Sequence, residues 1–230
     1  MTNKINRKYK LNENFFDNIN SEIKAYWLGF IWADGCIFKT NPRSSGPNRL
    51  NLTQKISELN HLELFKHAIQ SNHKITLNNN KQTYSLNINS RKLCKSLENL
   101  GFNIKTKRIN ISKMPNKLIR HFIRGYFDGD GCISIYTQNF KNYKIHRQEF
   151  SLTGNKDLLL QIQKILENNI NITRNLKIKT YKNTNKAVTI RYGKQSDIDK
   201  LFKYLYENAS IYLKSKYNKF LTFYSYYNKQ

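Results

Sequence analysis

Two segments of the chain match each other without gaps: YWLGFIWADGCI at residues 26–37 and FIRGYFDGDGCI at residues 122–133. Five of the nine glycines in the chain lie in these two segments, so composition alone does not explain the match. Each segment is an apolar run that ends in a glycine, which is a common helix stop. The repeat therefore predicts two equivalent helices, over residues 22–34 and 117–130, in a chain made of two similar halves.

The similarity continues downstream as a shared order of strands and helices. In each half, alternating strands and apolar-periodic helices follow the repeated segment in the same order. We expect helices over residues 57–70, 91–100, 156–168, 196–207 and 212–227, and strands over residues 36–40, 74–78, 83–89, 132–138, 175–182 and 187–192. The order predicts an α+β fold of two pseudo-symmetric αββαββα halves, each with an antiparallel sheet. We divide the chain into a basic N-terminal arm (1–21), a first repeat (22–107), a linker (108–116) and a second repeat with a C-terminal helix (117–230).

The charge of the chain points to a polyanionic partner. The 230 residues include 40 Lys and Arg but only 15 Asp and Glu, a net charge of +25, while 39% hydrophobic residues indicate a folded core. Such a charge repels itself unless a polyanion neutralises it, and nucleic acid is the usual one. The three cysteines lack metal-ligand spacing, which argues against a disulfide framework or a zinc module. Residues 1–10 have no apolar signal core and no apolar run reaches the roughly 20 residues of a membrane span, so we expect an intracellular protein with no membrane partner.

The small residues of the repeated segments predict how the two helices pack. Gly29 and Ala33 are four residues apart and share one helix face, as do Gly125 and Gly129. Small residues at this spacing let two helix backbones approach closely. We therefore expect the two helices to pack against each other and to join the halves.

Two acids end the predicted helices. Asp34 and Asp130 lie where the helix dipole is negative, and packed helices would also bring the two carboxylates together. Divalent cations relieve both penalties, and carboxylate oxygens suit magnesium. Two such ions can activate water and neutralise phosphate charge. A Lys-x-Lys step late in each half makes Lys105 and Lys214 symmetric candidates for polarising that water.

The alternating strands predict a polar and basic sheet face that is suited to a DNA major groove. Leu50 and Leu52, for example, alternate with polar residues along one strand. We expect DNA contacts from the polar residues of these strands: Thr40, Arg49, Asn51, Thr76, Asn78, Ser85, Asn87, Tyr136, Gln138, Arg147, Ser151, Lys177, Lys179, Tyr181, Thr189 and Arg191.

The two repeated segments resemble the LAGLIDADG motif, and two copies about a hundred residues apart resemble a single-chain LAGLIDADG homing endonuclease. The resemblance implies a monomer with pseudo-twofold symmetry, whose motif helices form the interface and whose two sheets form a saddle on a long DNA site. It implies cleavage of both strands across the minor groove with Mg²⁺, leaving short 3′ overhangs, with Mn²⁺ or Ca²⁺ substituting in binding.

The resemblance also assigns site residues. It implies metal ligation by Asp34 and Asp130, together with the carbonyls of Ala33 and Gly129. Gln54 matches a residue that positions water, and its counterpart in the second half is Gly154 or Asn155. Lys105 and Lys214 match the active-site lysines of the family. The chain departs from the motif at Trp32, where the earlier acid is expected and where the second copy keeps Asp128. The loss of symmetry at Gln54 suggests unequal cleavage rates on the two strands.

Two other functions remain open from the sequence. An RNA maturase that assists splicing of its host intron would have intron RNA as a partner and would show a basic patch away from the saddle. A non-catalytic DNA-binding regulator would have lost the acids, and both acids are present here. The AT-rich composition fits an organelle, a phage-infected cell or a low-GC bacterium equally well.

Overall fold

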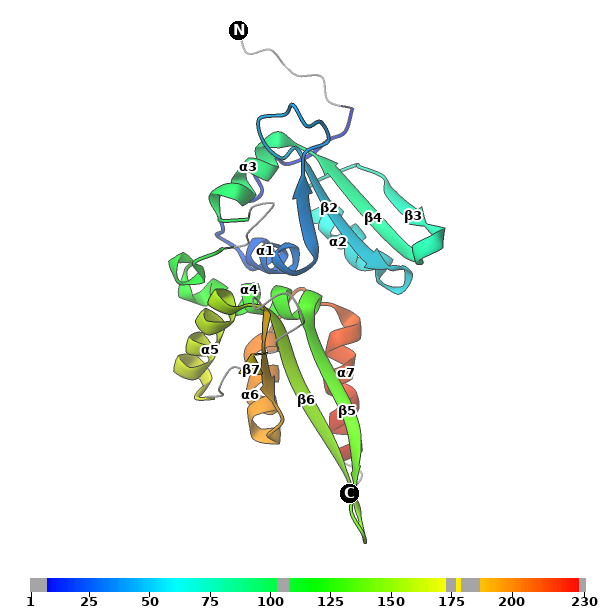
Figure 1. Ribbon diagram of the computed structural model, residues 1–230, viewed down its shortest axis with the longest axis vertical. Coiled ribbons are helices and arrows are strands. Elements are labelled where there is room, and N and C mark those ends of the chain that lie inside the picture. The colour runs from blue at the N-terminus through cyan, green and yellow to red at the C-terminus, as the bar shows by residue number, and fades with distance from the viewer. Residues whose placement is uncertain (1–7, 103–107, 173–176, 179–186, 228–230) are drawn as a thin grey trace. The chain divides into compact units, whose positions relative to one another are not determined.

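The computed structural model describes residues 8–102, 108–172, 177–178 and 187–227 (Figure 1). The chain forms two compact units: unit 1 comprises Met1–Ile19 and Asp34–Lys107, and unit 2 comprises Asn20–Ala33 and Arg108–Gln230. Helix α1 (Glu22–Asp34) therefore groups with unit 2 up to its last residue. This division differs from the expected one, which assigned the whole helix to the first repeat.

Unit 1 is built on a four-stranded antiparallel sheet with the order β1-β2-β4-β3. The apolar side of this sheet carries Leu50, Leu52, Leu86 and Ile88, which are at most 1% exposed, and α2 and α3 pack on it. The elements are β1 (Gly35–Phe38), β2 (Arg49–Lys55), α2 (Leu59–Ala68), β3 (Ile75–Asn78), β4 (Thr83–Asn89) and α3 (Arg91–Asn99), with short 3₁₀ turns η1 (Ile56–Glu58) and η2 (Asn79–Lys81).

Unit 2 repeats this arrangement with the sheet order β5-β6-β8-β7, so the predicted α+β class with two antiparallel sheets is confirmed. No helix in the described part of the chain is long and apolar enough to span a membrane. The elements are the turn η3 (Ile111–Lys113), α4 (Asn116–Asp130), β5 (Gly131–Asn139), β6 (Lys144–Asn155), α5 (Lys156–Ile170), β7 (Lys177–Ile178), β8 (Ala187–Tyr192), α6 (Gln195–Tyr206) and α7 (Lys214–Tyr227).

The predicted N-terminal arm is in part a packed segment of unit 1. Phe15 and Phe16 are buried, at 5% and 0% exposure, with their rings in edge contact. The hydroxyl of Ser90, which caps the start of α3, donates to Glu13, and a further serine hydroxyl on that helix donates to Asp17. The two aromatic rings therefore anchor part of the segment that the sequence analysis describes as a basic arm.

The predicted linker is also packed. Ile109 and Ile111 are buried in unit 2, where Gln161 on α5 binds the backbone of both. Its amide nitrogen donates to the carbonyl of Ile109 and its oxygen accepts from the amide of Ile111, both at 2.9 Å. Two buried apolar side chains and two hydrogen bonds from the Gln161 amide thus fix the chain just before α4.

Helices α1 and α4 meet within unit 2 at two glycines, as the repeat predicts. A Cβ added to Gly29 would lie 2.0 Å from the carbonyl oxygen of Phe122, and one added to Gly125 would lie 2.0 Å from that of Tyr26. Each glycine therefore faces the backbone of the other helix, where no side chain fits. The described contacts support Gly29 and Gly125 as the interface pair, while Ala33 and Gly129 are half-buried at the helix ends.

We predict that Gly29→Ala destabilises the protein strongly, because the new methyl group meets backbone atoms that cannot move without separating the helices. The expected loss in the free energy of unfolding is about 1–3 kcal/mol or more, measured by urea denaturation. Gly193→Ala is the matched control, since nothing lies within 4 Å of a Cβ at that position. Equal stability of the two variants would contradict the close approach.

Candidate nucleic-acid interface

The sheet of unit 1 has one mainly polar face. Register places Arg49, Asn51 and Thr53 of β2 opposite polar residues of β4, on the side away from the buried leucines. These cross-strand pairs are hydrogen-bonded: Arg49 Nε to Asn89 Oδ1 at 2.6 Å, Asn51 Nδ2 to Asn87 Oδ1 at 3.2 Å, and Thr53 Oγ1 to Ser85 Oγ at 2.7 Å. The bonds hold a row of donors and acceptors in place before any ligand binds.

Most of the contacts predicted in unit 1 share this face. Thr76 pairs with Ser85 across β3 and β4, and Asn78 pairs with Thr83, so both belong to the same polar row. Thr40 does not, because β1 ends at Phe38 and Thr40 lies in the loop that follows. There its hydroxyl accepts from Asn48 Nδ2 at 2.7 Å, so the predicted strand extension is wrong at this position.

Unit 2 has the equivalent face, with more charge. Tyr136 of β5 lies opposite Arg147 of β6, and Ser151 lies opposite Arg191 of β8. Gln138 alternates with Tyr136 and belongs to the same face, while Lys177 of β7 pairs with Thr189 in the strand register. Thr189 is only 1% exposed and bonds Thr153, so it supports the face from within. The predicted contacts Lys179 and Tyr181 lie outside the described residues.

The acid at the end of α1 has a polar neighbour on the sheet. Gln54, near the end of β2, donates from Nε2 to Oδ2 of Asp34 at 2.7 Å. Asp34 is half-buried at the end of α1. The structure therefore brings together the two residues that the motif resemblance links, and the amide fixes the orientation of the carboxylate.

A different group takes this place in unit 2. The strand register makes Gly154 the counterpart of Gln54, and a Cβ at Gly154 would lie 1.9 Å from the hydroxyl oxygen of Tyr126. That hydroxyl donates to the carbonyl of Thr153 at 3.2 Å. Burial, and then the nearby carboxylate of Asp130, raise the pKa of Tyr126 above its ordinary value. A protonated phenol thus fills the space of the missing side chain, while the other predicted counterpart, Asn155, caps the start of α5 with its oxygen.

The acid at the end of α4, Asp130, is exposed, and a lysine from another helix contacts the backbone of the residue that follows it. Lys216 on α7 donates from Nζ to the carbonyl oxygen of Gly131, with its ammonium 5.7 Å from the centre of the Phe127 ring. The predicted lysine, Lys214, is exposed at the first residue of the same helix. Its predicted partner Lys105 lies outside the described residues.

The second motif acid, Asp128, is buried in unit 2 with three hydrogen-bond donors. The hydroxyl of Tyr206 donates to Oδ1 at 2.6 Å, and Oδ2 accepts from the hydroxyl of Tyr26 at 2.8 Å and from the amide of Leu213 at 2.7 Å. Burial raises the pKa of Asp128 to about 6, although these bonds and the charge of Arg124 oppose the rise. The acid therefore joins α1, α4 and α6 and has no exposed surface for a ligand.

Arg124 extends this network one helical turn away. Its side chain is fully buried and donates to the carbonyls of Ile211 and Leu205, at 2.9 and 2.8 Å, and to the Glu22 carboxylate at 2.7 Å. Glu22 lies in the first turn of α1, so both ends of the Arg124–Asp128 stretch of α4 hold that helix. These polar bonds, together with the glycine contact, explain why α1 groups with unit 2.

Metal ligands are sparse in either unit taken by itself. Within the described residues, no group of three or more His, Cys, Asp or Glu side chains could hold an ion. Asp34 and Asp130 each follow a residue, Ala33 or Gly129, whose carbonyl is a second oxygen donor. Mg²⁺ keeps several waters and is often bound through one or two carboxylates, so this oxygen donor set fits magnesium.

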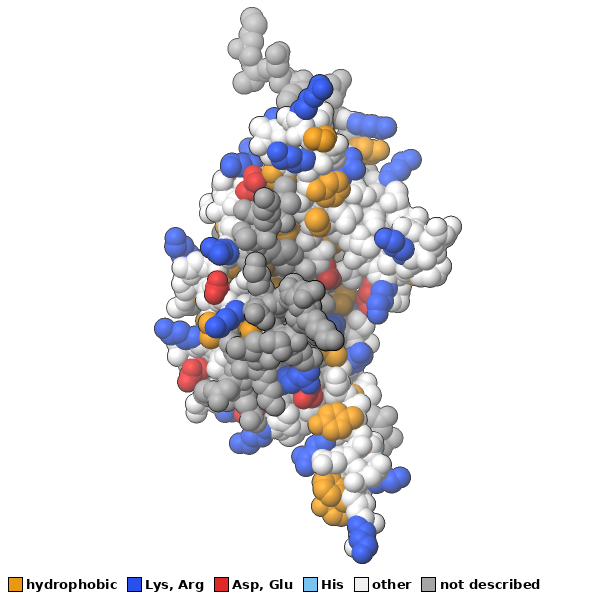
Figure 2. Space-filling view, viewed as in Figure 1, with side chains coloured by type: hydrophobic (Ala, Val, Ile, Leu, Met, Phe, Trp, Pro, Cys, Tyr) orange, Lys and Arg blue, Asp and Glu red, His pale blue; other side chains and the backbone are white. Residues whose placement is uncertain are grey.

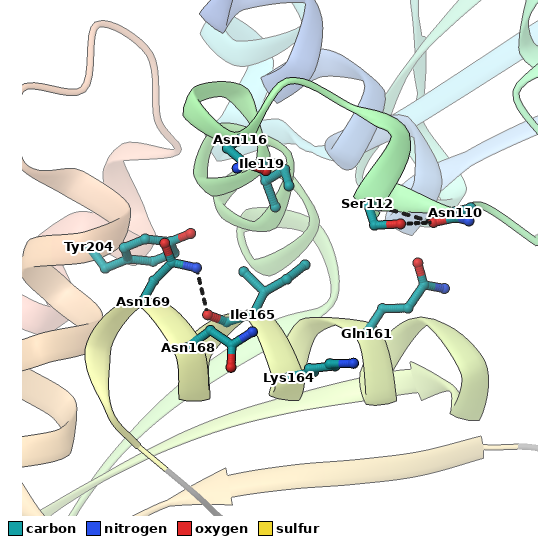
Figure 3. Close-up of a pocket in the computed structure, with 10 residues that line it drawn as sticks. All are labelled: Asn110, Ser112, Asn116, Ile119, Gln161, Lys164, Ile165, Asn168, Asn169 and Tyr204. Atoms are coloured by element: carbon teal, nitrogen blue, oxygen red, sulfur yellow. Dashed lines mark hydrogen bonds between the residues drawn. The ribbon is translucent and has the colours of Figure 1, made fainter.

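A separate cavity of about 710 Å³ lies among the helices of unit 2 (Figure 3). Amide side chains dominate its lining, with Asn110, Gln161 and Asn168 among them, and Lys164 is its one charged lining group. None of the predicted catalytic or DNA-contacting residues lines this cavity. It is therefore distinct from the polar sheet face.

Comparison with known proteins shows which proteins this architecture resembles. Residues 117–206 match the model of the LAGLIDADG-like domain, which covers the second repeat from α4 to α6. No curated protein sequence matches the chain significantly.

Solved structures with the same fold extend the LAGLIDADG likeness to both units. The I-LtrWI LAGLIDADG homing endonuclease bound to target DNA matches 95% of this chain and 92% of its own, with a TM-score of 0.64 and 14% identity. The meganuclease I-AabMI bound to uncleaved DNA matches 89% and 91%, with a TM-score of 0.63 and 15% identity. I-SmaMI bound to cleaved DNA matches 90% and 89%, with a TM-score of 0.61 and 16% identity. The chain thus has the fold of the single-chain LAGLIDADG homing endonucleases.

Two residues near Asp130 in unit 2 were not predicted from the sequence. Tyr126 lies inside the second motif, but only the register of β6 shows that its hydroxyl occupies the place of Gln54. Lys216 is the second lysine of the Lys-x-Lys step, and the first was chosen. The sequence already showed that both lysines could not serve the same site. Two residues apart on α7, their side chains point about 200° away from each other around the helix.

We predict that Asp128→Asn changes how stability depends on pH. The carboxyl binds its proton more tightly in the folded protein than in the unfolded chain, so its contribution is full below about pH 4 and is lost as the pH rises through about 6. Between these values the free energy of unfolding of the wild type should fall relative to that of Asp128→Asn, by roughly 2–3 kcal/mol. Urea denaturation from pH 4 to pH 7.5 measures the difference.

Tyr206→Phe is the control for this pH experiment. It removes one hydrogen bond to the carboxylate but keeps the titrating group. We therefore expect Tyr206→Phe to retain the wild-type loss of stability with rising pH. A constant difference between wild type and Asp128→Asn across this range would show that Asp128 titrates normally.

Proposed function

We propose that this protein is a site-specific endonuclease that hydrolyses one phosphodiester on each strand of a long duplex DNA site with Mg²⁺ and leaves short 3′ overhangs. The observation that carries the proposal is the pair formed by Asp34 and Gln54, in which the amide of a β2 side chain orients an acid at a helix end. The second acid, Asp130, stands at the same place relative to β5 as Asp34 does to β1.

In the proposed reaction some residues would bind the metal ion and others would position those ligands. Asp34 and Asp130 would hold magnesium with their carboxylates, assisted by the carbonyls of Ala33 and Gly129. Bound magnesium supplies an activated water and neutralises charge on the phosphate. Gln54 holds the first carboxylate in one orientation, and residues that orient ligands in this way commonly affect activity 10- to 100-fold or so.

Lysine side chains would supply positive charge near the metal-binding acids. Lys216, already bonded at Gly131, is placed to polarise water or to stabilise negative charge beside Asp130. Lys105 and Lys214 remain predictions for the same role. The difference between Gln54 in one unit and Tyr126 with Gly154 in the other supports unequal cleavage rates on the two strands.

The charge of the protein and its polar sheet faces support duplex DNA as the substrate. A net charge of +25 favours a polyanion, and the hydrogen-bonded rows on both sheets present donors and acceptors to base edges. The structural neighbours are described as bound to DNA, in one case to cleaved DNA. We further propose that the protein acts as a monomer inside the cell and serves intron homing.

We predict that Asp34→Asn and Asp130→Asn each abolish double-strand cleavage, because an amide is a poor magnesium ligand. The substrate is a duplex that joins the two sequences flanking the gene, incubated with full-length protein and Mg²⁺. Each variant should cleave at least about 100-fold more slowly than wild type, as measured by the loss of intact duplex on a gel. Ca²⁺ in place of Mg²⁺ should support binding, and chelation should stop cleavage.

Glu63→Gln on the surface of α2 is the matched control, because it removes the same charge far along the chain from either acid. Cleavage by the two Asp variants at the control rate would reject both residues as ligands. Wild-type binding without cleavage would favour a DNA-binding regulator. Salt-sensitive binding to the intron RNA without action on the duplex would favour a maturase.

We predict that Lys216→Met slows cleavage by roughly 10-fold or more, whereas Lys214→Met, two residues away on α7, has a smaller effect. The difference follows from the bond of Lys216 to Gly131 and the exposure of Lys214. Single-turnover cleavage at saturating protein separates this effect from DNA affinity. A larger loss in Lys214→Met would return the role to the lysine chosen from the repeat.

A further inference from the structure

The two units differ in how far their first hairpin extends. In unit 1, Arg49 of β2 pairs with Phe38 of β1 and also with Asn89 of β4, so all three strands end together. The next ten residues, 39–48, form a loop. In unit 2, β8 pairs with β6 only from Phe150 onward, while β5 and β6 continue together to their far ends. Unit 2 therefore has a two-stranded ribbon that unit 1 lacks.

This ribbon consists of residues 134–139 and 144–149 and projects from the sheet of unit 2 (Figure 1). Its six residue pairs span roughly 20 Å at the rise of an antiparallel strand. It closes through Phe140–Tyr143, whose rings stack with centroids 4.6 Å apart and planes at 16°. Because β5 begins directly after Asp130, the turn is the end of the ribbon farthest along the strands from the acid.

The exposed groups on the ribbon suit a nucleic acid better than a protein or a membrane. The ribbon and its turn carry three basic residues, Lys141, Lys144 and Arg147, and one acid, Glu149, which already pairs with Arg191 at 2.7 Å. The end of the ribbon shows Lys or Arg and hydrophobic side chains and no acidic ones in Figure 2. An uncompensated positive charge on a narrow projection is complementary to a phosphate-lined groove.

The register also gives the ribbon a reading face. Tyr136, Gln138 and Arg147 lie on the same side as Ser151, opposite the side that carries the buried Ile133 and Phe150. Tyr136 is 50% exposed and lies directly across from Arg147. This side continues the polar face of the unit 2 sheet, with Ile145 as an apolar member opposite Gln138. The major groove of B-DNA admits a two-stranded ribbon, and arginine and glutamine are its common readers of guanine and adenine.

We propose that the β5–β6 ribbon lies in the major groove beyond the four-stranded sheet, so that the half-site bound by unit 2 extends about six base pairs further than that sheet reaches. The half-site bound by unit 1 has no such extension, and the DNA target is asymmetric in length. Arg147 and Gln138 read bases in the extension, and Lys141 and Lys144 contact its phosphates. The proposal rests on the proposed function, since it requires duplex DNA as the partner.

The test uses full-length protein and a library of long random duplexes in the presence of Ca²⁺. Bound duplexes are sequenced and footprinted with hydroxyl radicals. We expect sequence preference and protection to extend further on one side of the centre of the site. A variant with residues 136–147 replaced by Asn-Gly, which forms a tight hairpin turn, should lose about four base pairs of protection on the longer side alone.

Point variants guard against misfolding of the shortened ribbon. Arg147→Ala should lose base preference at one outer position and weaken binding about 5- to 100-fold. Arg43→Ala, which removes the same charge from the loop that replaces the ribbon in unit 1, should leave the outer positions of the longer side unchanged. Selected sites with equal halves, or an unchanged footprint in the shortened variant, would overturn the ribbon proposal while leaving the endonuclease proposal standing. Failure of the wild type to bind any duplex would overturn both.

Discussion

The contact of backbone on backbone between α1 and α4 is the constraint on which unit 2 depends. Gly29 faces the carbonyl of Phe122 and Gly125 faces that of Tyr26, so each helix presents a bare stretch of main chain to the other. At this separation no side chain fits between the helices, and any substitution must push them apart. The ends of the same helices carry Asp34 and Asp130, so the glycines also set where each acid leaves its helix.

The two motif copies share this backbone role and differ in what their side chains do. In the last turn of α4 one position that differs is Asp128, which accepts bonds from α1 and α6 and whose pKa is raised by its burial. On α1 the equivalent position is Trp32, a large buried apolar group. One acid suffices for the interface, because its hydrogen bonds already reach across to Tyr26 of the other helix. A second acid there would add a buried charge for which burial is costly.

Features that follow from the local periodicity of the sequence were predictable. Features in which a residue from one element takes the place of a residue from another were not. The repeat, the helix ends, the glycine face and strands such as β4 and β8 follow from periodicity, because burial imposes the same period on sequence and structure. The packed N-terminal segment was missed because two phenylalanines decide its position among many polar residues. Tyr126 was missed because a side chain from a helix replaces one from a strand, and a linear alignment compares only residues at equal positions.

The asymmetry of the two units reaches from the acid to the far end of the first hairpin. In unit 1 an amide holds the acid and the hairpin ends in a loop, whereas in unit 2 a phenol takes the place of the amide and the hairpin becomes a ribbon. An amide that donates directly to a carboxylate restrains its orientation, while a phenol that donates to a backbone carbonyl leaves the carboxylate free of that particular bond. The unit with the longer ribbon therefore has a phenol, where the other unit has an amide, beside its acid. In the proposed endonuclease the two units would therefore differ both in the length of DNA that they contact and in the side chain that stands beside the acid.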